Sequence, residues 1–340
     1  MTSTAPPAIK PRRWLRHVLI GLTAVCILLG SAGVLYQSSA SSRDRRAHPM
    51  PGRRVDVGGY KMHLDCAGQG APAVILDSGL GDSYVSWQIV QPAIAQFTLV
   101  CSYDRAGLGY SDSSPRPRTS KVIAQELRTL LHNAAIEPPY ILVGHSMGGY
   151  DVRLYASLYP HEVAGMVLVD SSHPAQQTRL PPALLDRDAS WVRQQEFLAF
   201  TMPFGIPRLL GFCDHDLGVR AAECNLHSTF ESVSELKSVS QSAAQAAASG
   251  ALGDIPLVVL SHDPDHPEPE LPEDLVKPVS DTWQQMQNEL AGLSTRSTHV
   301  IAKNSGHYIQ IDRPDLVTEA VRKVAGEARE LRSTPESQPR

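Results

Sequence analysis

The chain has 340 residues, of which 42% are hydrophobic and 19% charged, so it is long enough for one large globular domain or for a domain with an insertion. The formal net charge is −4 and the isoelectric point is near 6.3. Because this composition supplies no broad basic face, it excludes nucleic acid as the expected partner.

The N-terminal region differs from the rest of the chain. Four basic residues precede an uncharged apolar stretch at 17–36, HVLIGLTAVCILLGSAGVLY. Twenty residues of helix rise about 30 Å, the thickness of the hydrocarbon core of a bilayer. A buried core helix is the alternative, but this stretch has no polar face. We therefore predict a basic segment at 1–16, a transmembrane anchor at 17–36 and a linker at 37–52.

The charges flanking this stretch predict its orientation. Four basic residues lie before the stretch, whereas three basic residues and one acidic residue, Asp44, lie after it. This asymmetry predicts that the N-terminus is inside and the remaining chain outside the membrane. Small residues at Ser38 and Ala40 would suit signal peptidase, so secretion after cleavage is the alternative. The apolar run is longer than in most signal peptides, and we favour a single-pass anchor with an extracytoplasmic domain.

Four cysteines lie outside the predicted anchor, and an even number permits disulfides in an oxidising compartment. Cys213 and Cys224 are close in sequence and are plausible partners. Free thiols are equally compatible with Cys66 and Cys101. Three connectivities are possible from the sequence.

From about Arg53 onward, short apolar runs alternate with helical patterns. The runs lie at 60–67, 73–77, 98–103, 140–143, 163–169, 257–260 and 299–302. The helical patterns lie at about 83–96, 120–134, 147–159, 281–293 and 313–331. Runs rich in Val, Ile and Leu are typical of strands buried on both faces, so the alternation predicts a doubly wound, mostly parallel α/β sheet.

The interval 172–253 interrupts this alternation. It contains several prolines and aromatic residues, followed by a helical segment rich in Ala, Ser and Gln. We predict a helical cap here, inserted into a core made of 53–171 and 254–332. The polar tail at 333–340 is predicted to be disordered.

A G-x-S-x-G motif, Gly144-His145-Ser146-Met147-Gly148, joins a predicted strand to a predicted helix. This strand–turn–helix context is the one required by a nucleophile elbow, in which the serine is exposed on a sharp turn. The alternative is a glycine-rich helix N-terminus with Ser146 as its cap. The context favours Ser146 as a nucleophile.

A serine nucleophile needs a base, and His307 is the best placed of the 13 histidines. It lies in Asn304-Ser305-Gly306-His307, between the last predicted strand and the last predicted helix. Such a loop lies at the same sheet edge as the elbow, where ligands bind in open α/β sheets. His307 is therefore the predicted general base.

These motifs resemble the α/β-hydrolase superfamily in its cap-bearing branch of esterases, C–C hydrolases, dehalogenases and epoxide hydrolases. The matching pieces are the elbow, the Gly306-His307 pair, and the segments 76–81 and 104–111. The resemblance implies an eight-stranded sheet and an oxyanion hole made by the backbone N–H groups of Leu80 and Met147. One departure is Ser78, where the family often has histidine, so the oxyanion loop must be supported differently.

The acid that orients the histidine has two main candidates. In most of the superfamily it follows the seventh strand, where Asp265 has the usual offset and Asp263 is a weaker alternative. Some members, including certain haloalkane dehalogenases, carry it at the end of the sixth strand, where this chain has Asp170. Asp170 is the preferred candidate and Asp265 the alternative.

The favoured function is hydrolysis of a carboxylic ester through an acyl-enzyme on Ser146. A C–C bond or amide hydrolase with the same residues is the alternative, and a non-catalytic ligand-binding protein is an alternative of another class. Dehalogenase and epoxide hydrolase chemistry is disfavoured, since those branches use aspartate at the nucleophile position. The cap aromatics suggest an apolar substrate of modest size, or else form the core of the cap. No metal or cofactor is expected, because no metal-ligand spacing or dinucleotide fingerprint occurs.

Overall fold

The computed structural model describes residues 13–215, 217–266 and 271–333, and its centre is an eight-stranded sheet. The strand order is β1-β2-β4-β3-β5-β6-β7-β8. The strands are β1 (Arg53–Asp56), β2 (Lys61–Ala67), β3 (Ala73–Asp77), β4 (Val100–Tyr103), β5 (Tyr140–His145), β6 (Val163–Val169), β7 (Leu257–His262) and β8 (Ser297–Ala302). β2 is antiparallel to β1 and β4, and the other pairs are parallel. The predicted doubly wound, mostly parallel sheet is confirmed.

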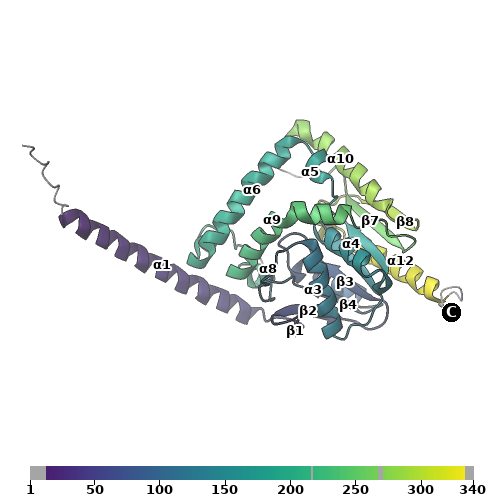
Figure 1. Cartoon of the computed structure of the whole chain (residues 1–340), viewed down its shortest axis with the longest axis horizontal. Helices are drawn as coiled ribbons and strands as arrows, with labels where there is room; N and C mark the ends of the chain where they lie inside the picture. The colour runs from purple at the N-terminus through teal and green to yellow at the C-terminus, as the bar shows by residue number, and fades with distance from the viewer. Residues whose placement is uncertain (1–12, 216, 267–270, 334–340) are drawn as a thin grey trace, which may run out of the picture.

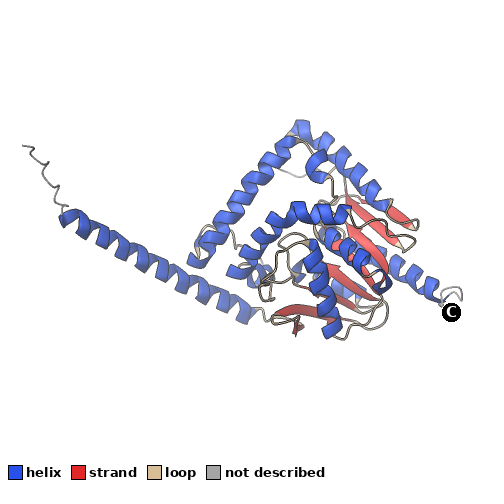
Figure 2. Ribbon diagram, in the orientation of Figure 1, coloured by secondary structure: helices blue, strands red, loops and turns tan. Residues whose placement is uncertain are grey.

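Helices cover both faces of this sheet (Figure 2). The core helices are η1 (Tyr84–Trp87), α2 (Gln91–Ile94), α3 (Ser120–Asn133), α4 (Gly148–Leu158), η2 (Pro160–Glu162), α10 (Glu273–Ala291), α11 (Ile309–Asp312) and α12 (Pro314–Ser333). Apolar residues of α3, α4 and α10 pack on one face, and those of η1, α2 and α12 pack on the other. Both faces of the central strands are therefore buried, which explains their continuous apolar runs.

Two helical predictions differ from the structure. The segment predicted as one helix at 83–96 forms the short helices η1 and α2, with Pro92 near the start of α2. The helix predicted to begin at 281 begins at Glu273, with Pro278 inside it. Proline lacks a backbone N–H and so interrupts a helical pattern in a sequence; Pro92 lies in the first turn of α2, where the N–H would have no partner, whereas Pro278 removes one hydrogen bond inside α10.

Among the described residues of the interval 172–253, every regular element of secondary structure is a helix. They are α5 (Gln176–Arg179), α6 (Pro182–Thr201), η3 (Met202–Phe204), α7 (Ile206–Leu209), α8 (Leu217–Glu223) and α9 (Leu226–Ala247). α9 packs against α3 and α4 of the core and against α6. This helix therefore makes the most extensive contact between the interval and the sheet domain, and α5 and α8 also touch the core.

The N-terminal helix α1 (Arg13–Ala47) extends away from the sheet domain (Figure 1). It is long and apolar enough to cross a membrane, with a mean hydropathy of 2.4 over its most apolar window. The helix continues through 37–47, where we expected a linker, because Gln37, Ala40 and Asp44 are buried against the interval 172–253. Of the predicted basic segment and tail, residues 1–12 and 334–340 lie outside the described residues.

The structure has two disulfides. Cys66 and Cys101 face each other across the antiparallel pair β2–β4, with a Cα–Cα distance of 4.1 Å. Cys213 and Cys224 are bonded within the helical interval. Of the three possible connectivities, the structure therefore has the two sequence-local pairs, and Cys66 and Cys101 are not free thiols.

Candidate active site

Ser146 occupies a sharp turn between β5 and α4. Its φ angle is +52°, a conformation that residues with a side chain rarely adopt and that costs backbone free energy. Its N–H donates to the carbonyl of Val169 at 3.1 Å, which fixes the turn against β6. A Cβ atom on Gly144 would lie 2.7 Å from the carbonyl oxygen of Gly148, so the turn requires glycine there. These features are those of the predicted nucleophile elbow.

Asp170 follows β6 directly, beside the elbow. Val169, the last residue of β6, pairs with His145 of β5, so the residues after these two strands are neighbours. The carboxylate of Asp170 is fully buried and accepts a hydrogen bond from Nδ1 of His307 at 2.6 Å. The structure thus brings His307 and Asp170 together at the sheet edge that carries Ser146.

Two further residues, His262 and Trp283, donate hydrogen bonds to the Asp170 carboxylate. Nδ1 of His262 lies 2.9 Å from Oδ2, and the indole N–H of Trp283 donates to Oδ1 at 2.8 Å. The backbone N–H of His262 also donates to Oδ1, at 3.0 Å. Burial alone would raise the pKa of Asp170, but the charges and hydrogen bonds of His262 and His307 more than offset it and hold the pKa well below its usual range. Asp170 is therefore ionised, and the histidines must donate to it.

The alternative acids lie elsewhere. Asp263 accepts hydrogen bonds from the N–H of Asn304 and from Nζ of Lys303, both at 2.9 Å, and so braces the loops after β7 and β8. The side chain of Asp265 is 84% exposed and pairs with Lys303. Nδ1 of His307 thus donates its hydrogen bond to Asp170, while Asp265 binds Lys303 on the protein surface.

His145, the residue before Ser146, is fully buried behind His307. Its Nε2–H donates to the carbonyl of His307 at 3.0 Å, and the two rings lie 4.7 Å apart. Burial and the neighbouring His307 lower the pKa of His145 to about 3, so its imidazole is neutral. His145 supports the backbone of the His307 loop and takes no part in the exposed turn.

Of the two predicted oxyanion donors, Met147 follows Ser146 directly, and Leu80 packs against the buried cluster that contains Met147. Leu80 lies in the loop after β3, and Met147 immediately precedes α4. Among the described residues, neither backbone N–H has a hydrogen-bond acceptor in the chain, as is usual for the first N–H groups of a helix such as α4.

The oxyanion loop is supported by a chain of serines where the family often has histidine. Oγ of Ser78 donates to the carbonyl of Ser83 at 3.0 Å and accepts from Oγ of Ser86 at 3.0 Å. Oγ of Ser83 in turn donates to the carboxyl of Glu223 at 2.7 Å. The expected difference in loop support is therefore found, and it includes a residue from α8.

An ion pair between the sheet domain and α9 holds the same loop. The guanidinium of Arg105 binds both carboxylate oxygens of Glu235, at 2.6 and 2.8 Å. It also donates to the carbonyls of Ser78 and Gly79, while Glu235 accepts the N–H of Gly81 at 2.9 Å. Both charged side chains are buried, so the pair is shielded from solvent. Backbone groups on both sides of Leu80 are thus fixed by one ion pair.

Sequence reasoning missed His262, Trp283 and Glu235. His262 ends a predicted strand, so its position gave a partial signal. Trp283 and Glu235 lie 113 and 130 residues from their partners and carry no local motif. Only the packing of α10 and α9 on the core brings them to the site.

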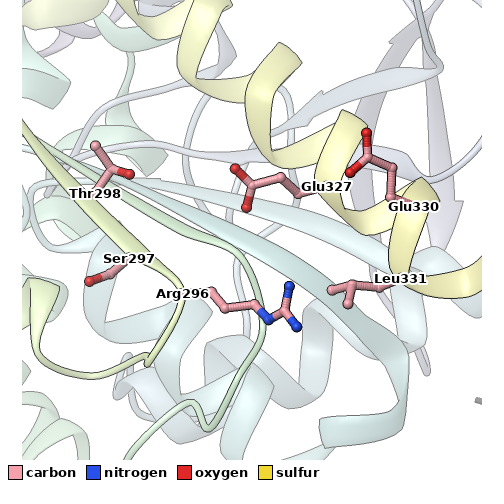
Figure 3. A pocket seen from close by; sticks show the side chains of 6 residues that line it. All are labelled: Arg296, Ser297, Thr298, Glu327, Glu330 and Leu331. Carbon is pink, nitrogen blue, oxygen red and sulfur yellow. The ribbon is translucent and has the colours of Figure 1, made fainter. Parts of the chain in front are cut away.

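A cavity of about 460 Å³ lies at the opposite edge of the sheet, where β8 begins and α12 ends (Figure 3). It is lined by Arg296, Ser297, Thr298, Glu327, Glu330 and Leu331. Ser146, Asp170 and His307 all follow the carboxyl ends of strands. This cavity is therefore separate from the candidate site. Within residues 13–215, 217–266 and 271–333, no cluster of His, Cys, Asp and Glu side chains is arranged to hold a metal ion.

Comparison with known proteins agrees with this geometry. Residues 72–248 match the family model of the α/β-hydrolase fold, and the chain belongs to this family. It is similar to the uncharacterized protein YqjL of Bacillus subtilis, 30% identical over 256 residues that cover 75% of this chain and 83% of YqjL.

Solved structures share the fold. A thermophilic esterase from Thermogutta terrifontis has a TM-score of 0.59 at 20% identity, covering 81% of this chain and 98% of the esterase. A haloalkane dehalogenase variant from Bradyrhizobium elkanii has a TM-score of 0.61 at 19% identity, covering 83% and 99%. These neighbours show the fold, and the reaction must be argued from the site residues.

Proposed function

We propose that this protein is a serine hydrolase that cleaves carboxylic esters of apolar small molecules through an acyl-enzyme on Ser146. The observation that carries the proposal is the 2.6 Å hydrogen bond between His307 and the buried carboxylate of Asp170, at the sheet edge where Ser146 occupies its strained turn. Nucleophile, acid and base then follow three strand ends of one sheet, in the chain order expected of this fold.

The hydrogen bond to Asp170 determines the role of His307. Because the ionised carboxylate can only accept, Nδ1 of His307 carries a proton, and in the neutral ring Nε2 is left to accept the proton of Ser146. The Oγ atom of Ser146 then attacks the ester carbonyl and forms a tetrahedral intermediate. His307 returns the proton to the departing alcohol, and water releases the acid from Ser146 by the same steps.

The backbone N–H groups of Leu80 and Met147 are the proposed oxyanion hole. They would donate to the oxygen that becomes negative in the tetrahedral intermediate, an interaction that can contribute about 3 kcal/mol per donor to lowering the barrier. The ion pair between Arg105 and Glu235 holds the loop that carries Leu80, and the serine chain holds it from the other side.

We further propose that α1 anchors the protein in a membrane, with residues 17–36 as the span and the hydrolase domain on the extracytoplasmic side. The length and apolar character of α1 support this. Two disulfides support an oxidising compartment for the domain. The excess of basic residues before the span supports an N-terminus on the cytoplasmic side.

A fluorophosphonate probe tests the nucleophile. The full chain should be labelled covalently, the Ser146→Ala variant should not, and Ser240→Ala, which changes an exposed serine on α9, should label like the wild type. The same proteins should hydrolyse a chain-length series of p-nitrophenyl esters in parallel with labelling. A folded wild-type chain that fails to label would favour a non-catalytic binding protein over a hydrolase.

A further inference from the structure

Six large apolar side chains are exposed on consecutive elements of the helical interval. We call this set the cap apolar edge, and it comprises Phe197, Phe200, Phe204, Leu209, Leu210 and Phe212. Phe200 is 71% exposed, Leu209 70% and Leu210 60%. The elements that carry them, α6, η3 and α7, contact one another. Large exposed apolar patches mark surfaces that bind a partner, since each exposed apolar Å² costs about 25 cal/mol in water.

The helix α1 passes directly beside this edge. A Cβ atom on Gly33 would lie 2.5 Å from the carbonyl oxygen of Phe204, and one on Gly30 would touch the ring of Phe204. The ring of Tyr36 lies against Gly205. Figure 1 shows the C-terminal end of α6 meeting α1 part-way along its length. Phe204, one member of the cap apolar edge, is thus level with residues 30–36 of α1.

This contact gives the edge a depth relative to the membrane. Tyr36 is the last residue of the apolar stretch, and Gly33 and Gly30 lie about 4.5 and 9 Å along the helix from it, at 1.5 Å per residue. Amphipathic elements that lie in the membrane interface bury their apolar face about 5–10 Å into the boundary between headgroups and acyl chains. A span ending at Tyr36 therefore places Phe204 at the depth of interfacial elements.

Polarity along α1 changes at the same level. Beyond Tyr36, the face of α1 toward the cap becomes polar, and Arg208 of α7 pairs with Asp44 at 2.7 Å and with Gln37 at 3.0 Å. Arg208 thus points toward the aqueous half of α1, while its neighbours Leu209 and Leu210 are exposed. The α7 turn separates polar from apolar groups as an interfacial element does.

We propose that the cap apolar edge inserts into the outer leaflet of the membrane that α1 crosses, so that α1 and the cap bind the bilayer as one surface. The inference rests on the proposed membrane anchorage of α1. The partner of the cap apolar edge is the acyl-chain and glycerol region of bilayer lipid, because the edge is contiguous with an apolar helix of membrane-spanning length.

The test uses the full chain in phosphatidylcholine vesicles with a fluorophore on a single introduced cysteine. Cys26→Ser removes the free thiol and leaves both disulfides. Probes are attached at Phe200→Cys and, independently, at Phe197→Cys, three residues earlier on α6. Leu28→Cys reports on the anchor, and Ile301→Cys, on β8, is the matched exposed control.

Spin-labelled lipid should quench the probes at 197, 200 and 28 several-fold more than the probe at 301. Aqueous iodide should instead quench the probe at 301. If the probe at 28 is quenched by lipid but those at 197 and 200 respond to iodide like 301, the docking inference is overturned and the anchor stands. If the probe at 28 does not reach lipid, the anchorage itself fails and the inference with it. Protection of 197 and 200 that disappears as the protein is diluted in lipid would assign the edge to a second copy and also overturn the inference.

Discussion

Asp170 is held by three side chains, and this arrangement explains why it and not Asp265 faces His307. Its own φ angle is +41°, so the chain turns sharply after β6 and directs the carboxylate toward the ends of β7 and β8. His262 and Trp283 then fix both carboxylate oxygens. A carboxylate fixed in this way orients the imidazole at little entropic cost when the substrate binds.

We predict that Asp170→Asn lowers kcat/KM for a p-nitrophenyl ester by about 10⁴, the loss measured when the acid of a serine triad is replaced by its amide. The amide would leave His307 in the wrong tautomer while preserving the packing. Asp265→Asn should keep nearly wild-type kcat/KM. Equal losses in both variants, measured by steady-state kinetics on folded protein, would contradict the assignment of the acid.

The stability of the folded chain depends on pH through the carboxyl group of Glu223. Burial and the nearby carboxyl of Asp82 raise its pKa from 4.5 to about 8. Between these values the folded chain keeps a proton that the unfolded chain has lost, so the stability from this group falls as pH rises through the window. Glutamine is neutral at every pH and can still accept from Ser83.

The Glu223→Gln variant should therefore gain a few degrees in Tm over the wild type at pH 8 and have a similar Tm at pH 5. Thermal unfolding of the full chain in detergent micelles measures this. Glu319→Gln, an exposed position on α12, is the matched control and should change little at either pH. A gain of the same size at both pH values would show that ionisation of Glu223 is not responsible.

At the scale of elements, α9 connects the cap to the catalytic core. Its residue Glu235 binds Arg105 and Gly81, and the neighbouring Ser232 lies close to Gly81 as well. Movement of α9 would therefore displace the loop that carries Leu80. A displacement of about 1 Å in a catalytic group can reduce the rate about 10²-fold.

We predict that Glu235→Gln lowers kcat by up to about 10², with a smaller change in KM, because it weakens the support of the oxyanion loop and leaves substrate contacts intact. Glu196→Gln, which breaks the exposed pair with Lys237 on the cap, is the control and should retain wild-type kcat. Kinetics are to be measured well below the Tm of each variant. A change confined to KM would argue instead for a role in substrate binding.

At the scale of the whole molecule, α1 is both the candidate span and a packing partner of the cap. Its buried face, Gln37, Ala40 and Asp44, has the spacing of one side of a helix. This packing ties the hydrolase domain closely to the end of the span and leaves little free linker between them.

The proposed topology predicts the accessibility of terminal tags in bacterial spheroplasts. A C-terminal tag should be removed by added protease, whereas an N-terminal tag should stay protected until the membrane is dissolved. Immunoblots detect both. Loss of the N-terminal tag from the mature protein would instead support cleavage of a signal peptide, and protease resistance of both tags in intact spheroplasts would contradict an extracytoplasmic domain.

Local patterns suffice to predict the class of fold, the elbow at Ser146 and His307 as the base. Apolar runs define strands, and a strand followed by Gly144, Ser146 and Gly148 defines a sharp turn. The position of His307 after the last strand follows from the order of elements along the chain.

The hydrogen bond that favours Asp170 over Asp265 is visible only in the folded molecule, since both residues follow strands that end at the same sheet edge. The choice depends on the register of β6 against β7 and on the direction of each side chain, which no local pattern specifies. The support of the oxyanion loop by Glu235 and the exposure of Phe200 were likewise beyond the sequence. Both depend on how α6 and α9 pack on elements far away in the chain, and packing is a property of the folded molecule.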